Sequence, residues 1–179
     1  AIVFSPKGTV RDIYRKRHLV MFGEYIPLGN QFPWLYDLLP IGPGLAAGDG
    51  VLNFEIEGVV FVPNICFEST VPHLVRNMMQ QSNTQGQRGD VMLNLTNDGW
   101  FWGSAMLDIH LRCNVMRAVE MRRPNLVAAN TGISAWITPT GKIVQQEAKR
   151  KDGFVIAQVG TATYDSVYMR FGDILSIVA

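Results

Sequence analysis

One cysteine of this sequence lies where a nucleophile would be useful. Cys66 lies four residues after the apolar run 58–62 and precedes Phe67 and Glu68. A thiol attacks a carbonyl carbon only as the thiolate, so a catalytic cysteine needs a cation or a base beside it. The backbone N–H of Phe67 could then stabilise the oxyanion of a tetrahedral intermediate. These residue types are compatible with acyl transfer through a thioester, although a lone cysteine is also a common small core residue.

A second group of ionisable residues lies upstream, where Lys16 stands in the basic run 15–18 and Glu24 follows it. A run of charges is normally a solvated face. However, an ammonium group beside the thiol would promote the thiolate and stabilise the oxyanion. Together with the family resemblance described below, this chemistry predicts that Lys16, Glu24 and Cys66 meet in one pocket.

Two aromatic clusters form a third set of candidates. One contains Trp34 and Leu35, and the other contains Trp100 and Phe101. Either cluster could belong to the core. Both lie in segments that we expect to be loops, where exposed apolar clusters tend to mark lipid or protein contact. We therefore treat the four residues as candidates for substrate binding.

The elements that would position Cys66 follow from the hydrophobic pattern. Residues 51–57 alternate between apolar and polar, which predicts a half-buried strand, and the run 58–62 predicts a buried one. Apolar residues at helical spacing predict a helix over 70–81. Cys66 would thus lie at a strand end ahead of a helix, at the sheet edge where α/β proteins bind ligands.

The same pattern repeats downstream. A strand is predicted at 91–95, then a turn with Asn97-Asp98-Gly99, then a helix over about 104–123. An apolar stripe on this helix predicts its buried face and makes Cys113 a core residue; the stripe is formed by Met106, Ile109, Cys113 and Met116.

The remaining pattern predicts short strands and one long loop. Strands are expected at 2–4 and 9–14 around a Pro/Gly turn, and residues 26–50 are rich in proline and glycine. Four further strands are expected at 126–130, 134–138, 143–146 and 154–159. Early alternation of strands with helices, followed by hairpins, predicts an α/β or mixed layered sheet.

Composition limits the possible classes of protein. The 179 residues are 47% apolar and 17% charged, and 16 Lys and Arg against 15 Asp and Glu leave a net charge of +1. This describes one folded domain and gives no electrostatic reason to expect nucleic acid. No apolar run approaches the roughly 18 to 20 residues of a membrane-spanning helix. Both ends of the chain are apolar and look cut, which predicts a piece of a longer polypeptide.

The sequence gives no sign of a metal or a cofactor. Its two cysteines lack the C-x-x-C spacing of a zinc or redox site. The three histidines show no metal-ligand spacing and are interpreted as structural; they are His18, His73 and His110.

In their order along the chain, several segments resemble the carbon-nitrogen hydrolase (nitrilase) superfamily, and within it the membrane branch of apolipoprotein N-acyltransferases. Any one motif would be weak, but the ordered combination from about residue 14 to residue 173 is specific. The motifs are Tyr-Arg-Lys-Arg-His-Leu at 14–19, Phe-Gly-Glu-Tyr-Ile-Pro at 22–27, Asn-Ile-Cys-Phe-Glu at 64–68 and Asn-Leu-Thr-Asn-Asp-Gly-Trp-Phe at 94–101, with support from 117–120 and 129–135.

The resemblance implies an α/β fold, a nitrilase-like α-β-β-α sandwich that is incomplete at the N-terminus, with residues 1–179 forming one catalytic domain. It also implies a Glu-Lys-Cys triad. Cys66 matches the nucleophile, Lys16 the catalytic lysine, Glu24 an additional glutamate and Glu68 the acidic residue after the nucleophile. The general-base glutamate lies upstream of the lysine in the family, whereas no glutamate precedes Tyr14 here.

The function that the resemblance implies is transfer of an acyl chain from a phospholipid to the N-terminal diacylglyceryl-cysteine of a lipoprotein. The partners would be a phospholipid and a lipoprotein. The domain would face the periplasm at the bacterial inner membrane, with membrane helices flanking it and apolar loops touching lipid. Two alternatives remain, namely a soluble nitrilase-type amidohydrolase and a catalytically inactive nitrilase-like binding module.

Overall fold

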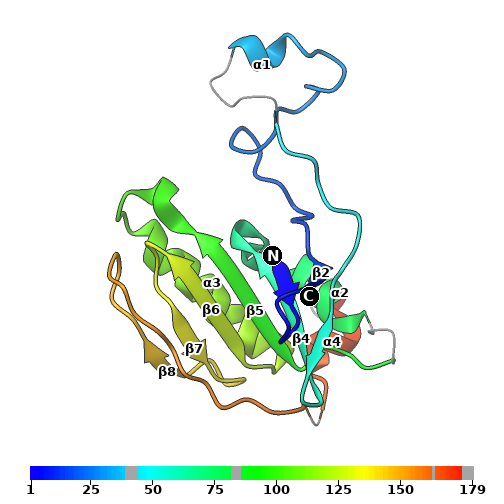
Figure 1. The fold of residues 1–179 in the computed structure, drawn as a ribbon, viewed down its shortest axis with the longest axis vertical. Coiled ribbons are helices and arrows are strands. Elements are labelled where there is room, and N and C mark those ends of the chain that lie inside the picture. The colour runs from blue at the N-terminus through cyan, green and yellow to red at the C-terminus, as the bar shows by residue number, and fades with distance from the viewer. Residues whose placement is uncertain (39–43, 82–85, 163, 175–179) are drawn as a thin grey trace.

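The computed structural model describes residues 1–38, 44–81, 86–162 and 164–174. Its centre is a six-stranded mixed sheet whose strands follow one another in chain order (Figure 1). The strands are β3 (Phe54–Ile56), β4 (Val59–Ile65), β5 (Val91–Asn97), β6 (Asn125–Asn130), β7 (Ala135–Ile137) and β8 (Ile143–Gln146). The α/β class expected from the sequence is confirmed.

The three strands β4, β5 and β6 are parallel, and the other neighbours are antiparallel. Ile65 pairs with Leu95, and Asn97 pairs with Asn130. The carboxyl ends of the parallel strands therefore lie at the same edge of the sheet. We call this edge the carboxyl edge.

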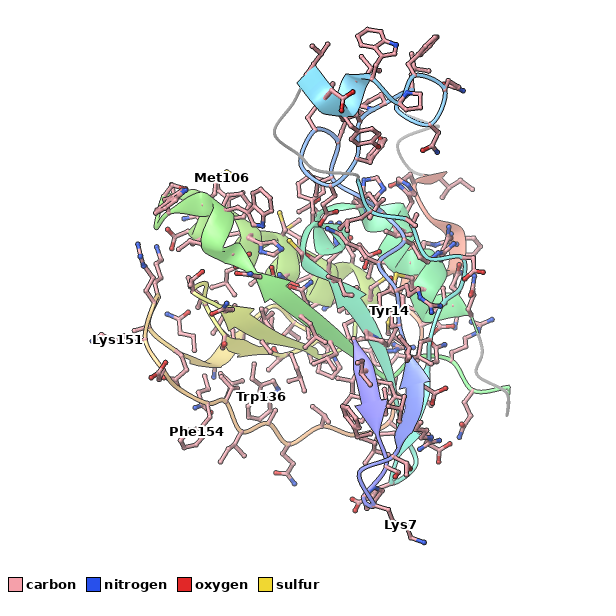
Figure 2. All side chains as sticks on the ribbon, turned by 45° about the horizontal axis from the view of Figure 1, so that its top comes forward. Lys7, Tyr14, Met106, Trp136, Lys151 and Phe154 are labelled. Atoms are coloured by element: carbon pink, nitrogen blue, oxygen red, sulfur yellow. The ribbon has the colours of Figure 1, made fainter. Side chains whose placement is uncertain are left out.

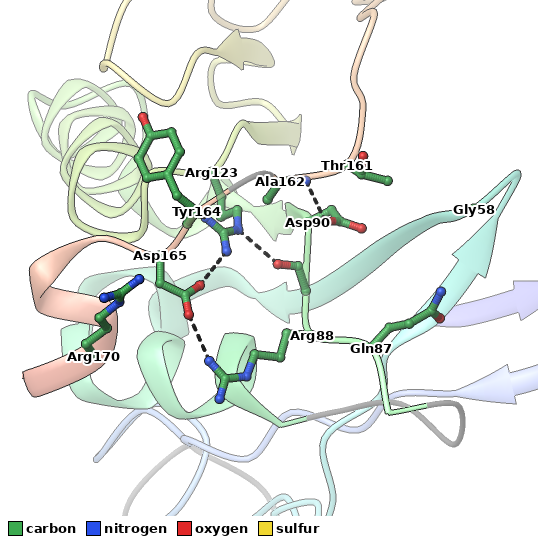
Figure 3. A pocket seen from close by; sticks show the side chains of 11 residues that line it. Gly58, Gln87, Arg88, Asp90, Arg123, Thr161, Ala162, Tyr164, Asp165 and Arg170 are labelled. Carbon is green, nitrogen blue, oxygen red and sulfur yellow. Dashed lines mark hydrogen bonds and ion pairs between the residues drawn. The ribbon is translucent and has the colours of Figure 1, made fainter.

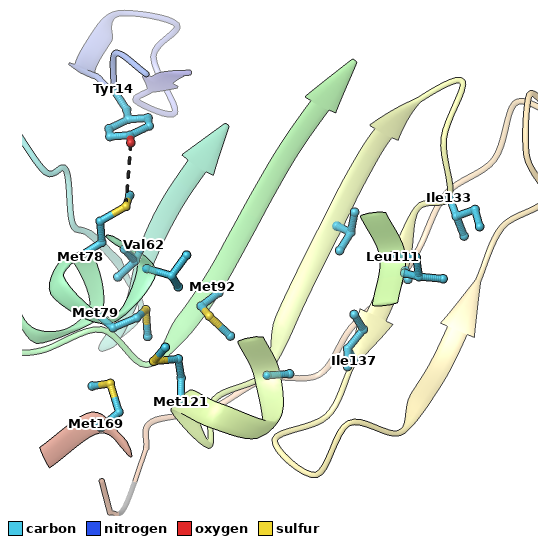
Figure 4. Packing of buried hydrophobic residues seen from close by; sticks show 14 residues of the cluster. Tyr14, Val62, Met78, Met79, Met92, Leu111, Met121, Ile133, Ile137 and Met169 are labelled. Atoms are coloured by element: carbon cyan, nitrogen blue, oxygen red, sulfur yellow. Dashed lines mark hydrogen bonds between the residues drawn. The ribbon is translucent and has the colours of Figure 1, made fainter. Parts of the chain in front are cut away.

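Helices cover one face of the sheet. Figure 1 shows α3 (Met106–Met121) behind the strands, and α3 contacts β6 as well as α2 (Pro72–Gln80) and α4 (Val167–Phe171). Pro72 opens α2, where the N–H that proline lacks would have no partner within the helix. Methionines fill much of the space between helices and sheet (Figure 4), because their flexible side chains fit irregular gaps; they are Met78, Met79, Met92, Met121 and Met169.

The N-terminal residues form the predicted hairpin. β1 (Ile2–Phe4) and β2 (Val10–Ile13) pair antiparallel and make a separate two-stranded sheet. The chain then leaves the body in a long excursion, whose described residues, 26–38 and 44–50, we call the arm. The arm carries the short helix α1 (Leu35–Leu38) at its far end (Figure 1).

Two short 3₁₀ turns, which the sequence analysis did not predict, lie at the carboxyl edge. η1 (Cys66–Thr70) follows β4, and η2 (Asp98–Phe101) follows β5. Among the described residues, no helix has both the length and the apolar content needed to cross a membrane.

The strand predicted at 154–159 is wrong. Residues 154–159 run alongside β8, but they contact it through the side chain of Gln145 and not through backbone pairing. Gln145 Nε2 donates to Phe154 O at 3.0 Å, and Gln145 Oε1 accepts from Ile156 N at 3.2 Å. Phe154 is 73% exposed and points away from the sheet (Figure 2). The strand predicted at 51–57 is shortened to β3.

The buried face predicted for α3 is also wrong. Three residues of the apolar stripe are exposed, with Met116 at 53%, and Cys113 is half-buried rather than in the core. The residues that face the interior are Leu107, His110, Leu111, Asn114, Arg117, Ala118 and Met121. Polar side chains on this face, among them His110 and Asn114, have hydrogen-bond partners in the interior, so a search for apolar spacing selects a different side of the helix.

Candidate active site

The backbone at Cys66 has a conformation that few residues adopt. β4 ends at Ile65, and Cys66 has φ of 54°, in the left-handed region that favours glycine. A non-glycine residue held there costs about 1–3 kcal/mol, and such strain tends to occur at functional sites. We call residues 64–70 the elbow. It places a free, half-buried cysteine at the carboxyl edge.

Glu68 ties the elbow to the segment that contains Lys16. Its carboxylate is fully buried and accepts hydrogen bonds from the backbone N–H of Arg17 at 2.7 Å, of His18 at 3.0 Å and of Ile65 at 2.6 Å. The hydroxyl of Tyr14 donates to both carboxylate oxygens, at 3.0 and 2.9 Å.

Tyr14 remains a donor in this arrangement. Burial, and after it the charge of Glu68, raises the pKa of the Tyr14 hydroxyl well above its ordinary value. The neutral phenol can therefore hold the carboxylate from one side while the backbone holds it from the other. Glu68 is in this way a positioning group for residues 14–18 rather than a group facing solvent.

Lys16 and Glu24, two of the three residues expected to share a pocket, form an ion pair. Lys16 Nζ lies 2.7 Å from Glu24 Oε1 and 2.8 Å from Oε2, and the Lys16 side chain is only 9% exposed. Val20 N also donates to Glu24 Oε2 at 2.9 Å. Glu24 thus orients a largely buried ammonium group, since a charge removed from water needs a close partner.

The arm passes close to this ion pair. Gly48 N donates to Lys16 O, and Leu45 N donates to Glu24 O, both at 2.7 Å. A Cβ at Gly48 would lie within 3.0 Å of the backbone of Arg15, so only glycine permits this approach.

Phe67 adds a second contact between the two segments. Its ring stacks on His18, with 6.3 Å between the ring centroids and 17° between the planes. The structure therefore brings Glu24 to Lys16, and it joins residues 14–18 to the elbow through Glu68 and Phe67.

The aromatic candidates do not form one surface. Leu35 is the first residue of α1 on the arm, and Trp34 precedes it, whereas Trp100 and Phe101 lie in η2 on the body (Figure 1). The two tryptophans are 56% and 69% exposed, and Leu35 and Phe101 are half-buried. Exposed apolar side chains therefore occur at two separate places beyond the carboxyl edge.

Sequence reasoning missed a buried polar group beneath the elbow. The Cys66 carbonyl accepts from Ser69 Oγ and Asn94 Nδ2, both at 3.2 Å, and His110 Nε2 lies 3.1 Å from it. His110 Nδ1 lies 3.0 Å from Asp98 Oδ1. The available signal was the polar spacing His110 and Asn114 on one face of α3, which an apolar pattern does not detect.

A cavity of about 430 Å³ lies at the opposite end of the strands (Figure 3). Three of its charged side chains pair, since Asp165 accepts from Arg123 at 2.7 Å and from Arg88 at 2.8 Å. Asp90 accepts from Ala162 N at 2.7 Å. These contacts attach the C-terminal residues to the sheet.

Within the ranges that the structure describes, no group of three or more His, Cys, Asp or Glu side chains could hold a metal ion. The groups at the carboxyl edge include a thiol, an ammonium–carboxylate pair and backbone N–H groups.

Comparisons with known proteins point to one family. A model of the carbon-nitrogen hydrolase family matches residues 1–168. An apolipoprotein N-acyltransferase from Rhodopirellula baltica is 40% identical over 171 residues, which is 94% of this chain and 30% of that protein. One from Bdellovibrio bacteriovorus is 34% identical over 147 residues, 79% of this chain and 26% of that protein. This chain thus spans about a third or less of the length of these relatives.

Solved structures show the same fold. A carbon-nitrogen hydrolase from Helicobacter pylori superposes with a TM-score of 0.61 at 14% identity, over 85% of this chain and 52% of the other. A CN-hydrolase superfamily protein from Xanthomonas campestris gives 0.58 at 22% identity, over 96% of this chain and 60% of the other.

Proposed function

This chain belongs to the carbon-nitrogen hydrolase family, and from that premise we propose that residues 1–179 are the nucleophile-bearing part of the catalytic domain of an apolipoprotein N-acyltransferase. The observation that carries the proposal is the elbow. A cysteine in a strained conformation lies at the carboxyl edge, and Glu68 attaches to it the segment that bears Lys16.

In the proposed reaction, the Cys66 thiolate attacks the ester carbonyl of a phospholipid. A C–S bond forms, and the carbonyl oxygen becomes an oxyanion, which the ammonium of Lys16 and the N–H of Phe67 stabilise. The ester C–O bond then breaks, the lysophospholipid takes a proton and leaves, and an acyl thioester remains on Cys66.

The second step regenerates the thiol. The amino group at the N-terminus of a lipoprotein attacks the thioester carbonyl, a C–N bond forms and the C–S bond breaks. The amine gives up one proton, and the product is an N-acylated lipoprotein. The general-base glutamate of this scheme belongs to a part of the protein outside these 179 residues, which is consistent with the fraction of the relatives that the chain spans.

The substrates of this reaction are lipids, so we place the domain at the periplasmic face of the bacterial inner membrane. Trp34 and Leu35 on the arm, and Trp100 and Phe101 in η2, would contact lipid. The large exposed fractions of both tryptophans support this assignment, because apolar groups on a surface gain by leaving water.

The test is a pair of cysteine variants in the full-length protein. With a phospholipid that carries a fluorescent acyl chain, Cys66→Ala should abolish the acyl-enzyme, whereas Cys113→Ala should form it at the wild-type level. Mass spectrometry locates the acyl group on the protein. A normal thioester in Cys66→Ala would overturn the proposal.

A further inference from the structure

Three buried polar side chains from three different elements meet beneath Cys66. His110 comes from α3, Asp98 from η2 and Ser69 from η1, and they are 6%, 2% and 1% exposed. None of them belongs to the set formed by Cys66, Lys16 and the two glutamates. Burying such groups is costly unless each is hydrogen-bonded, so their arrangement calls for a reason.

The contacts of the imidazole fix how its nitrogens are used. Nδ1 lies 3.0 Å from Asp98 Oδ1, and Nε2 lies 3.1 Å from the Cys66 carbonyl oxygen and 3.0 Å from Ser69 Oγ. Carboxylate and carbonyl oxygens only accept hydrogen bonds. The Nε2–H donates to the Cys66 carbonyl, and Nδ1 faces the Asp98 carboxylate, so the imidazole is held between these two groups.

The carbonyl that His110 contacts belongs to the same peptide unit as the Phe67 N–H. A trans peptide is planar, with its C=O and N–H pointing to opposite sides. Ser69, Asn94 and His110 all hold the Cys66 carbonyl toward the interior. The Phe67 N–H must therefore point the other way, out of the elbow.

We propose that His110, held by Asp98, is a positioning residue that locks the Cys66–Phe67 peptide so that the Phe67 N–H stabilises the oxyanion of the acyl-transfer reaction. This inference rests on the proposed function and assigns one part of its machinery. The same contacts offset the strain of the left-handed Cys66 backbone.

The downstream motif around residue 132 fits this arrangement. A Cβ at Gly132 would overlap Asp98 Oδ2, so the glycine leaves room for the carboxylate. Thr96 Oγ1 donates to Asp98 Oδ1 at 2.7 Å and holds it from another direction. Asp98 is thus confined beside the imidazole by residues of β5 and of the β6–β7 connection.

The experiment compares two reactions of Cys66 in the full-length protein, with Cys113→Ala as the background so that Cys66 is the only cysteine of this chain. Acylation from the fluorescent phospholipid develops an oxyanion. Alkylation by iodoacetamide displaces iodide at a CH₂ group and develops none. The variants are His110→Leu, which removes the donor, His110→Gln, whose amide can donate from a similar position, and Ser69→Ala.

We expect His110→Leu to slow acylation about 100-fold, as loss of an oxyanion donor does, while alkylation changes less than about twofold. His110→Gln should recover most of the lost acylation rate, and Ser69→Ala should show a smaller selective loss. Unchanged acylation in His110→Leu, or no recovery in His110→Gln, would overturn the inference. If His110→Leu misfolds and loses both reactions, the Ser69→Ala variant provides the test. Equal losses of acylation and alkylation in Ser69→Ala, or no loss of acylation, would count against the proposal.

Failure of this inference is distinguishable from failure of the proposed function. If Cys66→Ala still becomes acylated, the proposed function is wrong. If Cys66→Ala is inert and His110→Leu acylates normally, only the role of His110 is wrong.

Discussion

The elbow and the arm depart from the usual pattern of burial in opposite directions. At the elbow, a carboxylate and a serine hydroxyl are buried together with the imidazole of His110 beneath them, and each has close hydrogen-bond partners. The arm instead exposes large apolar side chains, among them Leu28, Phe32, Trp34, Leu38 and Leu45. Both arrangements are costly in an isolated domain.

The difference separates two tasks. Buried polar groups with fixed partners hold a reacting group in one geometry, which is what covalent chemistry requires. Exposed apolar groups on an extended segment need no single geometry, because burial of apolar area is non-directional. The elbow is thus built for chemistry, and the arm is suited to contact with an apolar surface.

The largest effect is expected from a substitution of Glu68 in the elbow. In Glu68→Gln, the amide group cannot accept all the hydrogen bonds that the carboxylate accepts from Arg17, His18 and Ile65. Each buried donor left unsatisfied costs about 1–3 kcal/mol. We expect the free energy of unfolding of the domain to fall by about 3 kcal/mol or more, and acylation of Cys66 to be lost because Lys16 is released.

The matched control is Asp12→Asn in the β1–β2 hairpin. Asp12 is 38% exposed, and its ion pair with Arg11 is 3.6 Å long, so this carboxylate-to-amide change should be nearly neutral. Chemical denaturation of the two variants measures the difference. Equal stability of Glu68→Gln and Asp12→Asn would contradict a positioning role for Glu68.

Local patterns predicted the frame of the site well. The apolar runs at 58–62 and 91–95 lie in the parallel strands β4 and β5, because strands buried on both faces are rich in apolar residues. The strand-to-helix position of Cys66 followed from them. The family motif predicted that Lys16, Glu24 and Cys66 share one pocket. The structure pairs Lys16 with Glu24, and the place of Cys66 in that pocket stays a prediction.

The parts that the sequence did not predict depend on tertiary partners. η1 is a 3₁₀ turn whose Glu68 and Ser69 are bonded to residues of the N-terminal segment and of α3, so no local pattern encodes it. The buried face of α3 was assigned to the wrong side because His110 and Asn114 face inward. Polar residues that are satisfied only in the folded chain are invisible to an apolar pattern.

A smaller effect is expected from substitution of the exposed apolar residues of the arm and of η2. The double change Trp34→Ser and Trp100→Ser removes two large exposed apolar side chains, one from the arm and one from η2. If they contact lipid, acylation of Cys66 from phospholipid vesicles should fall about tenfold, since fully burying one such side chain is worth about 1.5–3 kcal/mol. Alkylation of Cys66 by iodoacetamide should not change.

Phe154→Ser provides the control for this experiment, because Phe154 is 73% exposed but lies beside β8, away from the arm. It should leave both reactions unchanged. Equal losses of acylation and alkylation in the double variant would indicate a collapsed fold. No loss in either reaction would make the tryptophans ordinary surface and favour the soluble amidohydrolase.

The smallest effect is expected at Glu120, a partly buried carboxylate that accepts fewer hydrogen bonds than Glu68. Arg117 donates to Glu120 Oε1 at 2.6 Å, but Oε2 has no hydrogen-bond partner within the described residues. Burial therefore raises the pKa of Glu120 above its ordinary value, although the Arg117 charge acts against the shift. The folded protein thus binds this proton more tightly than the unfolded chain does.

By linkage, the contribution of Glu120 to stability is fully present below the ordinary glutamate pKa and is lost as the pH rises through the raised folded pKa. Glu120→Gln cannot ionise, so it does not show this loss. The melting temperature of Glu120→Gln relative to wild type should therefore increase between about pH 4 and pH 8, by no more than about 2–4 °C. Calorimetry across this range measures the difference. If the melting temperatures of the two proteins changed in parallel with pH, Arg117 alone would offset the cost of burying the Glu120 carboxylate. A single ion pair would then stabilise a buried carboxylate as well as the several donors around Glu68 do.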